Sequence, residues 1–427
     1  MRLCYVIHQF FPYAQSGTEQ YCLATAREAR RRGDDVTIVS LHWDHDRASP
    51  AISLHEEPYD GFRVIRLNHW QRINANDVLR DYENLHLDGW FQRVLGEVRP
   101  DAVHFFHLRQ LGANLMQVAK ASGVRVVVSL TDFWFLCPRF TLLRSDGALC
   151  SGPPDGGAGC VACQHPELAG TAPAAGPARL ADDKPARLRA LLDRPATLRE
   201  SLQHADAVFA PSRFLADMFV ANRCAHPRLM VLPYGLEPGR IVPLPTPRPR
   251  QPLRIGFCGV MSPWKAPHLL VAAMAQVTAP CEVRLHGRID EPMFAEFIAT
   301  MRAAAAHDPR IQFPGSYGHA EAAAVFAAMD VLVVPSVWYE NTPFVVLEAF
   351  AAGVPVVASD LGGLAEVVRH GENGFLFRAG DAAALGALLQ QLASEPQRLQ
   401  QLTMPQPPGI AGNYDAFAAA YRTRSPV

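Results

Sequence analysis

The sequence predicts an α/β protein built from two doubly wound, parallel-sheet domains. Short apolar runs alternate with helix-like segments, as expected for parallel sheets that are buried on both faces. This alternation stops in a proline-rich stretch and then begins again. In addition, a chain of 427 residues is too long for one hydrophobic core, so two or three domains are expected.

The first domain is expected over residues 1–235. It begins with the apolar run LCYVIH, a loop, a helix-like segment that stops at Gly33 and the run DVTIVS, which together predict a βαβ unit. Three further strand-like runs follow, RVIRL, PDAVHFFHL and GVRVVVSL. Between about residues 137 and 180 the pattern gives way to Gly, Pro, Ala and Cys, which predicts an irregular insertion.

The second domain is expected over residues 253–410, after an extended, proline-rich linker at 236–252. Its strand-like runs are LRIGFCGV, CEVRLHG, IQFPG, DVLVVPS and VPVVAS. A last amphipathic helix at 411–427 is expected to pack back on the first domain. Doubly wound sheets bind ligands at the carboxyl ends of their strands, so we expect the binding site in a cleft between the domains.

Composition excludes several classes of protein. The net charge of −1 argues against a nucleic-acid partner. The sequence has no run of about 18 apolar residues, so no membrane span is expected. The amino terminus is typical of a β-strand rather than a signal peptide. We therefore expect a cytoplasmic protein, in which thiols stay reduced.

The most informative motif is SVWYENTPFVVLEAFAAGVPVVASDLGG. Glu340 and Glu348 are separated by seven residues, and Pro343 between them suits the first turn of a helix. The backbone N–H groups of 341–345 would then form an anion site. Carboxylates next to an anion site suit a ligand with phosphates in the middle and hydroxyls at each end. The motif therefore predicts a nucleotide-sugar site.

These residues resemble the GT-B glycosyltransferases of family 4. The hallmark of that family is Glu-x7-Glu, followed by an Ala-rich helix, a Gly-x-Pro-Val-Val strand and a Gly-Gly loop, which here is Gly362–Gly363. SGTE near the start and ADAVFAPS and VLPYGLE before the linker also match, so the resemblance covers essentially the whole chain. It implies the GT-B architecture, two Rossmann-like domains facing an interdomain cleft. The cysteine-containing insertion points to a subgroup with four cysteines.

The resemblance implies that Glu348 accepts the donor's ribose hydroxyls, that Glu340 contacts the transferred sugar and that Lys265 neutralises the leaving diphosphate. A fixed cation stabilises the negative charge that a departing diphosphate gains. The family's frequent Arg is replaced by Val260, so backbone amides or Arg288 can complete the phosphate clamp. The other predicted donor-binding residues are Gly17, Gly259, Asn341, Thr342, Pro343 and Phe344.

In the first domain, Asp132 follows the strand VVVSL and is predicted to contact a sugar or acceptor hydroxyl. We group it with Glu340 and Lys265 as a catalytic candidate. Family members commonly place a His just before this carboxylate, whereas this chain has Thr131. His104 or His107, at the end of the preceding strand, can compensate, and Thr131 and His107 are assigned to the acceptor or sugar side.

Four cysteines form the pattern Cys137-x12-Cys150-x9-Cys160-x2-Cys163. A closing C-x2-C with two more thiols at loop distances fits a tetrahedral, structural Zn²⁺ site. Iron–sulfur ligation and plain reduced thiols remain alternatives. A metal here would tie down a loop that shapes acceptor access. The family resemblance implies that catalysis uses no metal or other cofactor.

By resemblance, the chain is expected to transfer a sugar with retention from a UDP- or GDP-sugar to a saccharide or lipid-linked acceptor. Such a reaction fits cell-surface polysaccharide or glycolipid synthesis, with peripheral contact at the inner membrane face. Two alternatives are a GT-B sugar-nucleotide epimerase and a nucleotide-sugar-binding protein without activity. The sequence does not distinguish the base, the sugar, the acceptor or the oligomeric state.

Overall fold

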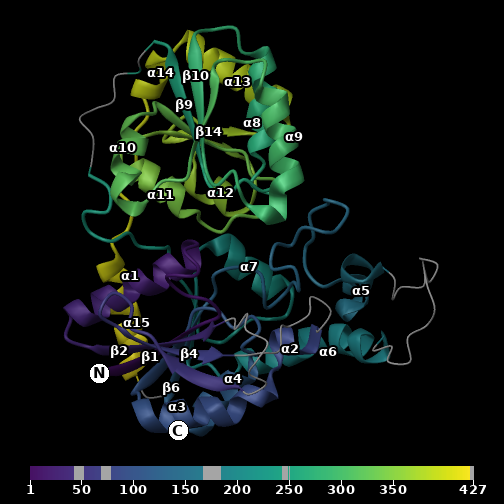
Figure 1. Cartoon of the computed structure of the whole chain (residues 1–427), viewed down its shortest axis with the longest axis vertical. Coiled ribbons are helices and arrows are strands. Elements are labelled where there is room, and N and C mark those ends of the chain that lie inside the picture. Colours follow the sequence, from purple (N-terminus) through teal and green to yellow (C-terminus); the bar gives the residue numbers. More distant parts are fainter. Residues whose placement is uncertain (43–51, 69–77, 167–183, 243–248, 250, 424–427) are drawn as a thin grey trace. The chain divides into compact units, whose positions relative to one another are not determined.

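The structure is a computed structural model of the whole chain, and it describes all residues except 43–51, 69–77, 167–183, 243–248, 250 and 424–427 (Figure 1). The described chain divides into two compact units. The first comprises Met1–Pro233 and Ile410–Val427, and the second comprises Tyr234–Gly409. Each unit holds one sheet of mainly parallel strands with helices around it, so the predicted α/β class is confirmed.

In the described residues, the sheet of the first unit has eight strands in the order β3-β4-β2-β1-β5-β6-β7-β8. All neighbours are parallel except β3 and β4. The central strand β1 is buried from its second residue onward, as its continuous apolar run predicts. The strands are β1 (Arg2–Ile7), β2 (Asp35–His42), β3 (Ser53–Glu56), β4 (Arg63–Asn68), β5 (Ala102–Phe105), β6 (Arg125–Ser129), β7 (Ala207–Ala210) and β8 (Leu229–Val231).

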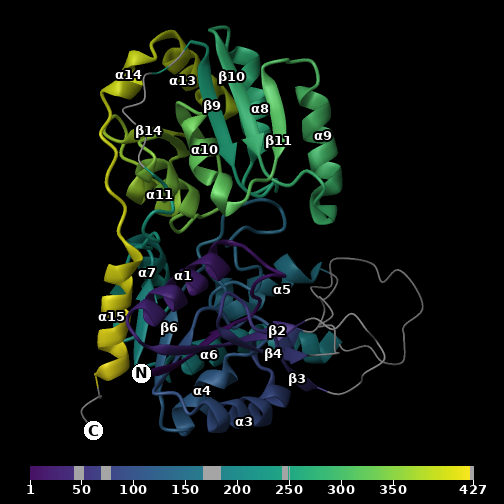
Figure 2. The same cartoon turned by 60° about the vertical axis from the view of Figure 1, so that its left-hand side comes forward.

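Helices of the first unit pack around this sheet, and α15 lies beside β6 and α1 (Figures 1 and 2). They are α1 (Gly17–Arg31), α2 (Val78–Tyr82), η1 (Leu85–Leu87), α3 (Asp88–Val98), α4 (Asn114–Ala121), η2 (Pro154–Gly157), α5 (Ala158–Gln164), α6 (Lys184–Leu202), α7 (Arg213–Ala221) and α15 (Ile410–Arg422).

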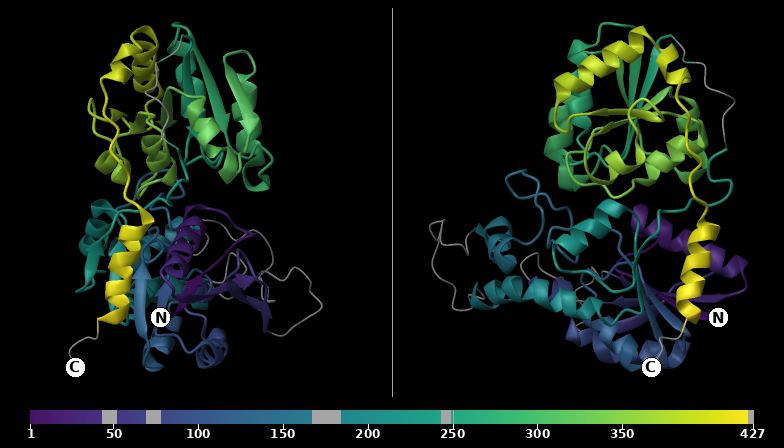
Figure 3. Two further views of the ribbon diagram at one scale, coloured as in Figure 1. Left: turned by 90° about the vertical axis from the view of Figure 1, so that its left-hand side faces the viewer. Right: turned by 180° about the vertical axis from the view of Figure 1, so that it is seen from behind.

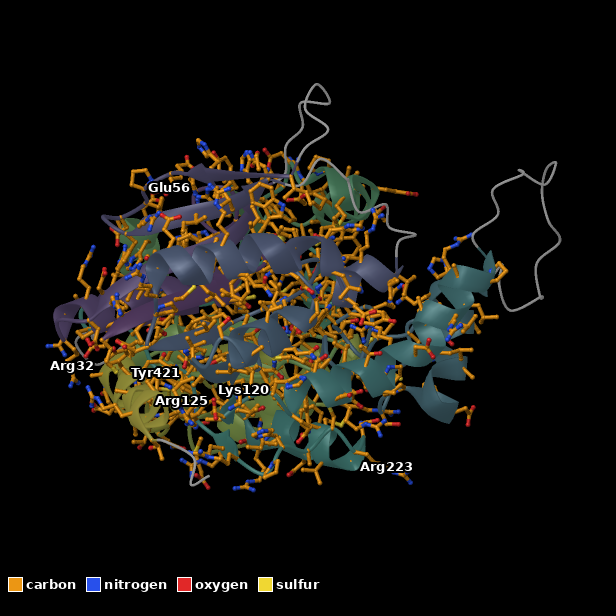
Figure 4. All side chains as sticks on the ribbon, turned by 90° about the horizontal axis from the view of Figure 1, so that it is seen from below. Arg32, Glu56, Lys120, Arg125, Arg223 and Tyr421 are labelled. Atoms are coloured by element: carbon orange, nitrogen blue, oxygen red, sulfur yellow. The ribbon has the colours of Figure 1, made fainter. Side chains whose placement is uncertain are left out.

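The last helix, α15, belongs to the first unit although it follows the second in the sequence (Figure 3). Asn413 donates a hydrogen bond to the Pro233 carbonyl at 2.8 Å, and Arg125 donates one to the Ala420 carbonyl at 3.1 Å. Arg125 and Lys120 lie close together in Figure 4, and both bond to the buried carboxylate of Asp206, at 2.8 and 2.7 Å. Polar contacts at the amino ends of β6 and β7 therefore help to fix α15.

His104 lies in the core between the sheet and α15. Its ring nitrogens are 2.6 Å from the Tyr421 hydroxyl and 2.8 Å from Ser129 Oγ, and the ring stacks on Phe106. Burial lowers the pKa of His104 to about 3. His104 is therefore a packed, neutral histidine.

We expect acid to destabilise the first unit partly through His104. In the unfolded chain this side chain takes up a proton below about pH 6.5, whereas the folded protein resists protonation down to about pH 3. Stability from the neutral ring is thus complete above pH 6.5 and is lost as the pH falls, by at most about 1.4 kcal/mol per pH unit. The unfolding midpoint, measured between pH 4 and 7, should fall less steeply with decreasing pH in His104→Gln than in the wild-type protein. The exposed His307→Gln is the control, and an unchanged slope in His104→Gln would contradict this assignment.

The described part of the second unit contains a six-stranded parallel sheet in the order β11-β10-β9-β12-β13-β14. The strands are β9 (Leu253–Cys258), β10 (Cys281–His286), β11 (Ile311–Gly315), β12 (Val331–Val334), β13 (Val356–Ser359) and β14 (Gly374–Phe377). The helices are α8 (Pro267–Ala273), η4 (Met274–Gln276), η5 (Pro292–Phe294), α9 (Ala295–Ala305), η6 (His319–Glu321), α10 (Ala322–Ala327), α11 (Phe344–Ala351), α12 (Gly362–Val367), α13 (Ala382–Ser394) and α14 (Gln397–Gln400).

Two apolar clusters form the core of the second unit. One contains side chains of α8, α9 and α13, and the other contains side chains of α10, α11 and α12. Strand residues alternate between them, since Val331 and Val333 belong to the first cluster while Leu332 and Val334 belong to the second. The sheet is therefore covered by helices on both faces, which leaves its strand ends available for a site.

The proline-rich stretch is only partly described, because 243–248 and 250 lie outside the described residues. Its first residues are packed on the second unit. Leu236 N donates to the Pro408 carbonyl at 2.9 Å, and Ile241 is buried in the second core cluster. Burial of Ile241 explains why this part does not run as an extended linker.

Candidate functional site

The Glu-x7-Glu segment begins where β12 ends and runs into α11. Glu340 lies in the loop, whereas Glu348 lies within α11. Pro343 occupies the position just before the first helical residue, one residue earlier than the predicted first turn, and it adopts an extended conformation. Both carboxylate side chains are buried, at 4% and 5% exposed for the whole residues. Buried carboxylates are costly unless they are paired, so their partners define the site.

Glu340 is held by three donors that converge on one oxygen. Its Oε1 accepts hydrogen bonds from Lys265 Nζ at 2.6 Å, Ser336 Oγ at 2.7 Å and Trp338 Nε1 at 2.8 Å. Lys265 comes from the loop between β9 and α8, and its ammonium also lies 5.3 Å from the centre of the Trp338 ring. No described residue donates to Glu340 Oε2, so this oxygen can accept a hydrogen bond from a ligand hydroxyl.

Glu348 is held in the same manner by Arg240. The guanidinium Nε and Nη2 lie 2.6 and 2.5 Å from Glu348 Oε1. Burial raises the pKa of Glu348, and the charge of Arg240 opposes this effect. In the described part of the chain no group donates to Glu348 Oε2. Each carboxylate therefore pairs one oxygen with a cation from a distant segment and keeps the other for a ligand.

The Gly-Gly loop fixes the backbone beside Glu340. Gly363 N donates to the Glu340 carbonyl at 2.8 Å. A Cβ at position 363 would lie 1.5 Å from the Asn341 carbonyl oxygen, so only glycine, which has no Cβ, fits at this position. Loop 340–341 and the start of α12 are thus in direct backbone contact, and this contact sets the position of Glu340.

Other predicted donor-binding residues have varied surroundings. Thr342 is buried, and Phe344 stacks on Tyr234 with ring centres 4.9 Å apart. Gly259 directly follows β9, and its N–H donates to the His286 carbonyl at 3.0 Å. Arg288 is 61% exposed and lies near Asp290 and Glu291, at 3.4 and 3.8 Å. The structure therefore does not bring Arg288 to the Lys265–Glu340 pair, because acidic residues next to it in the sequence attract its side chain.

In the first unit, His107 and Asp132 come together at the carboxyl ends of β5 and β6. His107 Nε2 lies 3.0 Å from Asp132 Oδ2, and Arg109 N donates to His107 Nδ1 at 3.1 Å. Since Nδ1 accepts, Nε2 carries the proton and donates to Asp132. Asp132 Oδ1 accepts a second hydrogen bond from Trp134 N at 2.8 Å. The dyad is therefore oriented at both ends.

Several neighbours of this dyad bear on the predictions. His8, which follows β1, packs against His107 with ring centres 4.2 Å apart, and burial lowers its pKa well below the usual value. Thr131 Oγ1 donates to the Phe106 carbonyl at 3.3 Å. Gly17 opens α1 beside the Ser16–Glu19 capping pair. His104 is absent from this cluster because it faces the core.

The four cysteines lie in one region of the first unit. Cys150 Sγ donates to the Gly152 carbonyl at 3.0 Å, and burial raises the pKa values of Cys137 and Cys160. Among the described residues, no three His, Cys, Asp or Glu side chains are grouped closely enough to hold a metal ion. The structure thus shows thiols rather than an assembled ligand set, and the zinc site stays a prediction from the spacing.

Sequence comparison identifies both units. A model of the glycosyl transferase 4-like domain matches residues 16–235, about half of the chain, and a model of the glycosyl transferases group 1 matches residues 252–395. The chain therefore belongs to the family of glycosyltransferases that these two models describe. Among curated relatives, D-inositol 3-phosphate glycosyltransferase of Thermomonospora curvata is 33% identical over 44% of this chain and 51% of its own length. Phosphatidyl-myo-inositol mannosyltransferase of Mycobacterium leprae is 45% identical over 19% of this chain and 22% of its own length. The matches to the first relatives span about half of their length.

Solved structures with the same fold cover nearly the whole glycosyltransferase chain. HepE of Anabaena, solved with UDP and glucose, has a TM-score of 0.63 and 17% identity and covers 98% of this chain and 95% of its own. Sucrose-phosphate synthase of Thermosynechococcus elongatus has a TM-score of 0.64 and 18% identity over 98% of this chain and 96% of its own. These likenesses confirm the GT-B fold class. Among the described helices of this glycosyltransferase, none combines the length and apolar character needed to cross a membrane.

Sequence reasoning missed four residues of these two clusters: Arg240, Ser336, Trp338 and His8. Ser336 and Trp338 stand four and two residues before Glu340, so their proximity was visible but their donor role was not. His8 follows β1 directly and His107 lies two residues after β5, so both histidines stand just beyond a strand's carboxyl end, and this shared position was visible in the sequence. Arg240 carried no signal, because it reaches Glu348 from 108 residues away.

Proposed function

We propose that this chain transfers a sugar from a nucleoside-diphosphate sugar to a hydroxyl acceptor. The observation that carries the proposal is the pair of buried carboxylates, Glu340 and Glu348, each bonded at Oε1 to a cation. No described residue donates to the Oε2 atom of either carboxylate, so both atoms can accept hydrogen bonds from hydroxyl groups. Carboxylates at the carboxyl edge of a parallel sheet, with a lysine between strand and helix, suit a ligand that has hydroxyls on both sides of a diphosphate.

In this proposal Glu348 accepts from the ribose and Glu340 accepts from the donor sugar. Lys265 then stands beside the sugar, where the bond to the diphosphate breaks. As the anomeric carbon leaves the diphosphate oxygen, the ammonium of Lys265 stabilises the charge that this oxygen gains. The acceptor oxygen bonds to the anomeric carbon with retention of configuration, and its proton passes to the departing diphosphate. No metal ion is assigned to this step.

The acceptor side is assigned to the first unit. The His107–Asp132 dyad supports this, since a carboxylate oriented by an imidazole N–H and a backbone N–H can accept a hydrogen bond from a sugar or acceptor hydroxyl. Thr131, on the same strand end, adds a hydroxyl. His107 stands in for the histidine expected at position 131 from the resemblance.

The relatives support a choice of donor and acceptor classes for this proposal. HepE was solved with UDP-glucose, which supports a UDP-sugar as the first donor to examine. The curated relatives are named for inositol-containing acceptors, which supports an acceptor rich in hydroxyls, either free or lipid-linked. A lipid-linked acceptor would place the protein at the inner face of the membrane, in envelope polysaccharide or glycolipid synthesis.

A panel of UDP-, GDP- and ADP-sugars tests this proposal. The full chain is expected to hydrolyse one donor slowly without an acceptor, and Glu340→Gln should remove that hydrolysis while the protein stays folded. Donor binding without turnover, even with saccharide and lipid-linked acceptors, would instead favour a nucleotide-sugar-binding protein. Release of a free epimerised sugar would favour an epimerase.

A further inference from the structure

Arg240 occupies an unusual position for an arginine on a connecting segment. Its side chain is 10% exposed and that of Glu348 is 7% exposed. The segment is anchored on both sides of Arg240, since Tyr234 stacks on Phe344 at the start of α11 and Ile241 is buried in the core. The guanidinium is therefore delivered to α11 in a fixed position.

A buried ion pair of this kind is weak support for stability, because desolvation of both charges offsets their attraction. The pair is asymmetric in addition. Nε and Nη2 both contact Oε1 of Glu348, at 2.6 and 2.5 Å, instead of forming two parallel bonds to the two oxygens. This arrangement fixes the rotation of the carboxylate and leaves Oε2 for another donor.

Among the described residues near Glu348, Arg240 supplies the largest opposing charge. Tyr317 and Cys258 interact with Glu348, and burial raises the pKa of each, so both stay neutral; a phenol or a thiol has no cationic form. His319, at the start of η6, also lowers the pKa of Glu348, but by less than Arg240 does. Without the guanidinium, burial would favour a protonated Glu348, which accepts hydroxyl hydrogen bonds less well than a carboxylate does.

We propose that Arg240 is a positioning residue of the donor site, which holds Glu348 as an oriented carboxylate for the ribose hydroxyls of a nucleoside diphosphate. This inference rests on the proposed function. It means that the segment before β9, which contains Arg240, contributes to the affinity for the donor. Loss of Arg240 should therefore weaken binding of the ribose hydroxyls and leave the contacts of the base and the phosphates unchanged.

Calorimetric titration of the full chain tests this. UDP, GDP and ADP are titrated into the wild-type protein first. The nucleotide that binds is then used with Arg240→Gln, Arg240→Lys, Glu348→Gln and the double variant Arg240→Gln/Glu348→Gln. Arg240→Gln should weaken binding by about 10- to 100-fold, as expected for a lost charge-assisted contact. Arg240→Lys should restore part of the affinity. The double variant should bind no more weakly than Glu348→Gln, because both changes act through one interaction.

Two further readouts separate positioning from a structural role. The 2′,3′-dideoxy form of the same nucleoside diphosphate should bind wild-type and Arg240→Gln equally, since it has no ribose hydroxyls. Affinity of Arg240→Gln for the normal nucleotide should fall more steeply than that of wild type as the pH is lowered from 8 to 6. Arg254→Gln is the matched control, because it breaks the comparable ion pair with buried Asp330 at the opposite ends of the strands. It should lower the unfolding midpoint and leave affinity unchanged.

The inference is overturned if Arg240→Gln binds the nucleotide as tightly as wild type does. It is also overturned if this variant binds more tightly, because the guanidinium would then compete with the ribose for Glu348. It is also overturned if the dideoxy nucleotide loses affinity to the same extent. Failure of the proposed function has a different signature: no nucleoside diphosphate binds, or Glu348→Gln binds as tightly as wild type.

Discussion

Replacing Lys265 by Ala is expected to lower donor turnover by about 10²- to 10³-fold, the range seen when one stabiliser of transition-state charge is removed. The site should survive the change, because Ser336 and Trp338 continue to donate to Glu340 Oε1. We therefore expect a small effect on the affinity for the nucleotide sugar and a large effect on kcat. Steady-state hydrolysis of the preferred donor, with kcat and KM determined separately, measures both.

The matched control for this variant is Arg369→Ala. Arg369 and Glu372 form an exposed ion pair in the same unit, with side chains 64% and 66% exposed, so its loss should change neither turnover nor stability measurably. If Lys265→Ala keeps turnover within threefold of wild type, Lys265 does not act on the leaving group.

The second large effect is expected for Gly363→Ala. The added Cβ would lie 1.5 Å from the Asn341 carbonyl oxygen and 2.6 Å from that of Glu340, so loop 340–341 has to move. Overpacking of this kind costs about 1–3 kcal/mol of stability. A displacement of about 1 Å at a reacting group costs about 10²-fold in rate, so donor turnover should fall by at least this factor.

Gly412→Ala is the control for the glycine change. Gly412 lies in α15 with no atom within 4 Å of an added Cβ, so alanine should raise the thermal unfolding midpoint slightly. A Gly363→Ala protein with wild-type turnover and midpoint would show that the loop accommodates a side chain, and that the backbone contact does not set the position of Glu340.

Much of the fold could be predicted because its determinants are local. Runs such as DVLVVPS and VPVVAS become β12 and β13, since continuous β-branched residues suit strands buried on both faces. The spacing of Glu340 and Glu348 likewise identified the segment around α11. Contacts across large sequence separations could not be predicted in this way. His104 and Tyr421 are 317 residues apart, and periodicity contains no information about which surface a terminal helix will cover.

The candidate site shows the same division. The identity of Lys265 followed from motif resemblance, but its contact with Glu340 depends on how the loops after β9 and β12 meet. Arg288 was the more obvious candidate for a second cation, yet Asp290 and Glu291 lie beside its side chain. Arg240 lies in a stretch whose composition predicts a linker, whereas the packing of Leu236 and Ile241 on the second unit shows that the described residues before position 243 are folded.

Hydrogen exchange of the full chain, with and without the nucleoside diphosphate that the donor panel selects, tests the location of the donor site most directly. The proposed function predicts slower exchange of backbone amides in segments 336–348 and 262–266 of the second unit, and loss of that protection in Glu348→Gln. Protection confined to the first unit, in a protein that still turns over the donor, would contradict it.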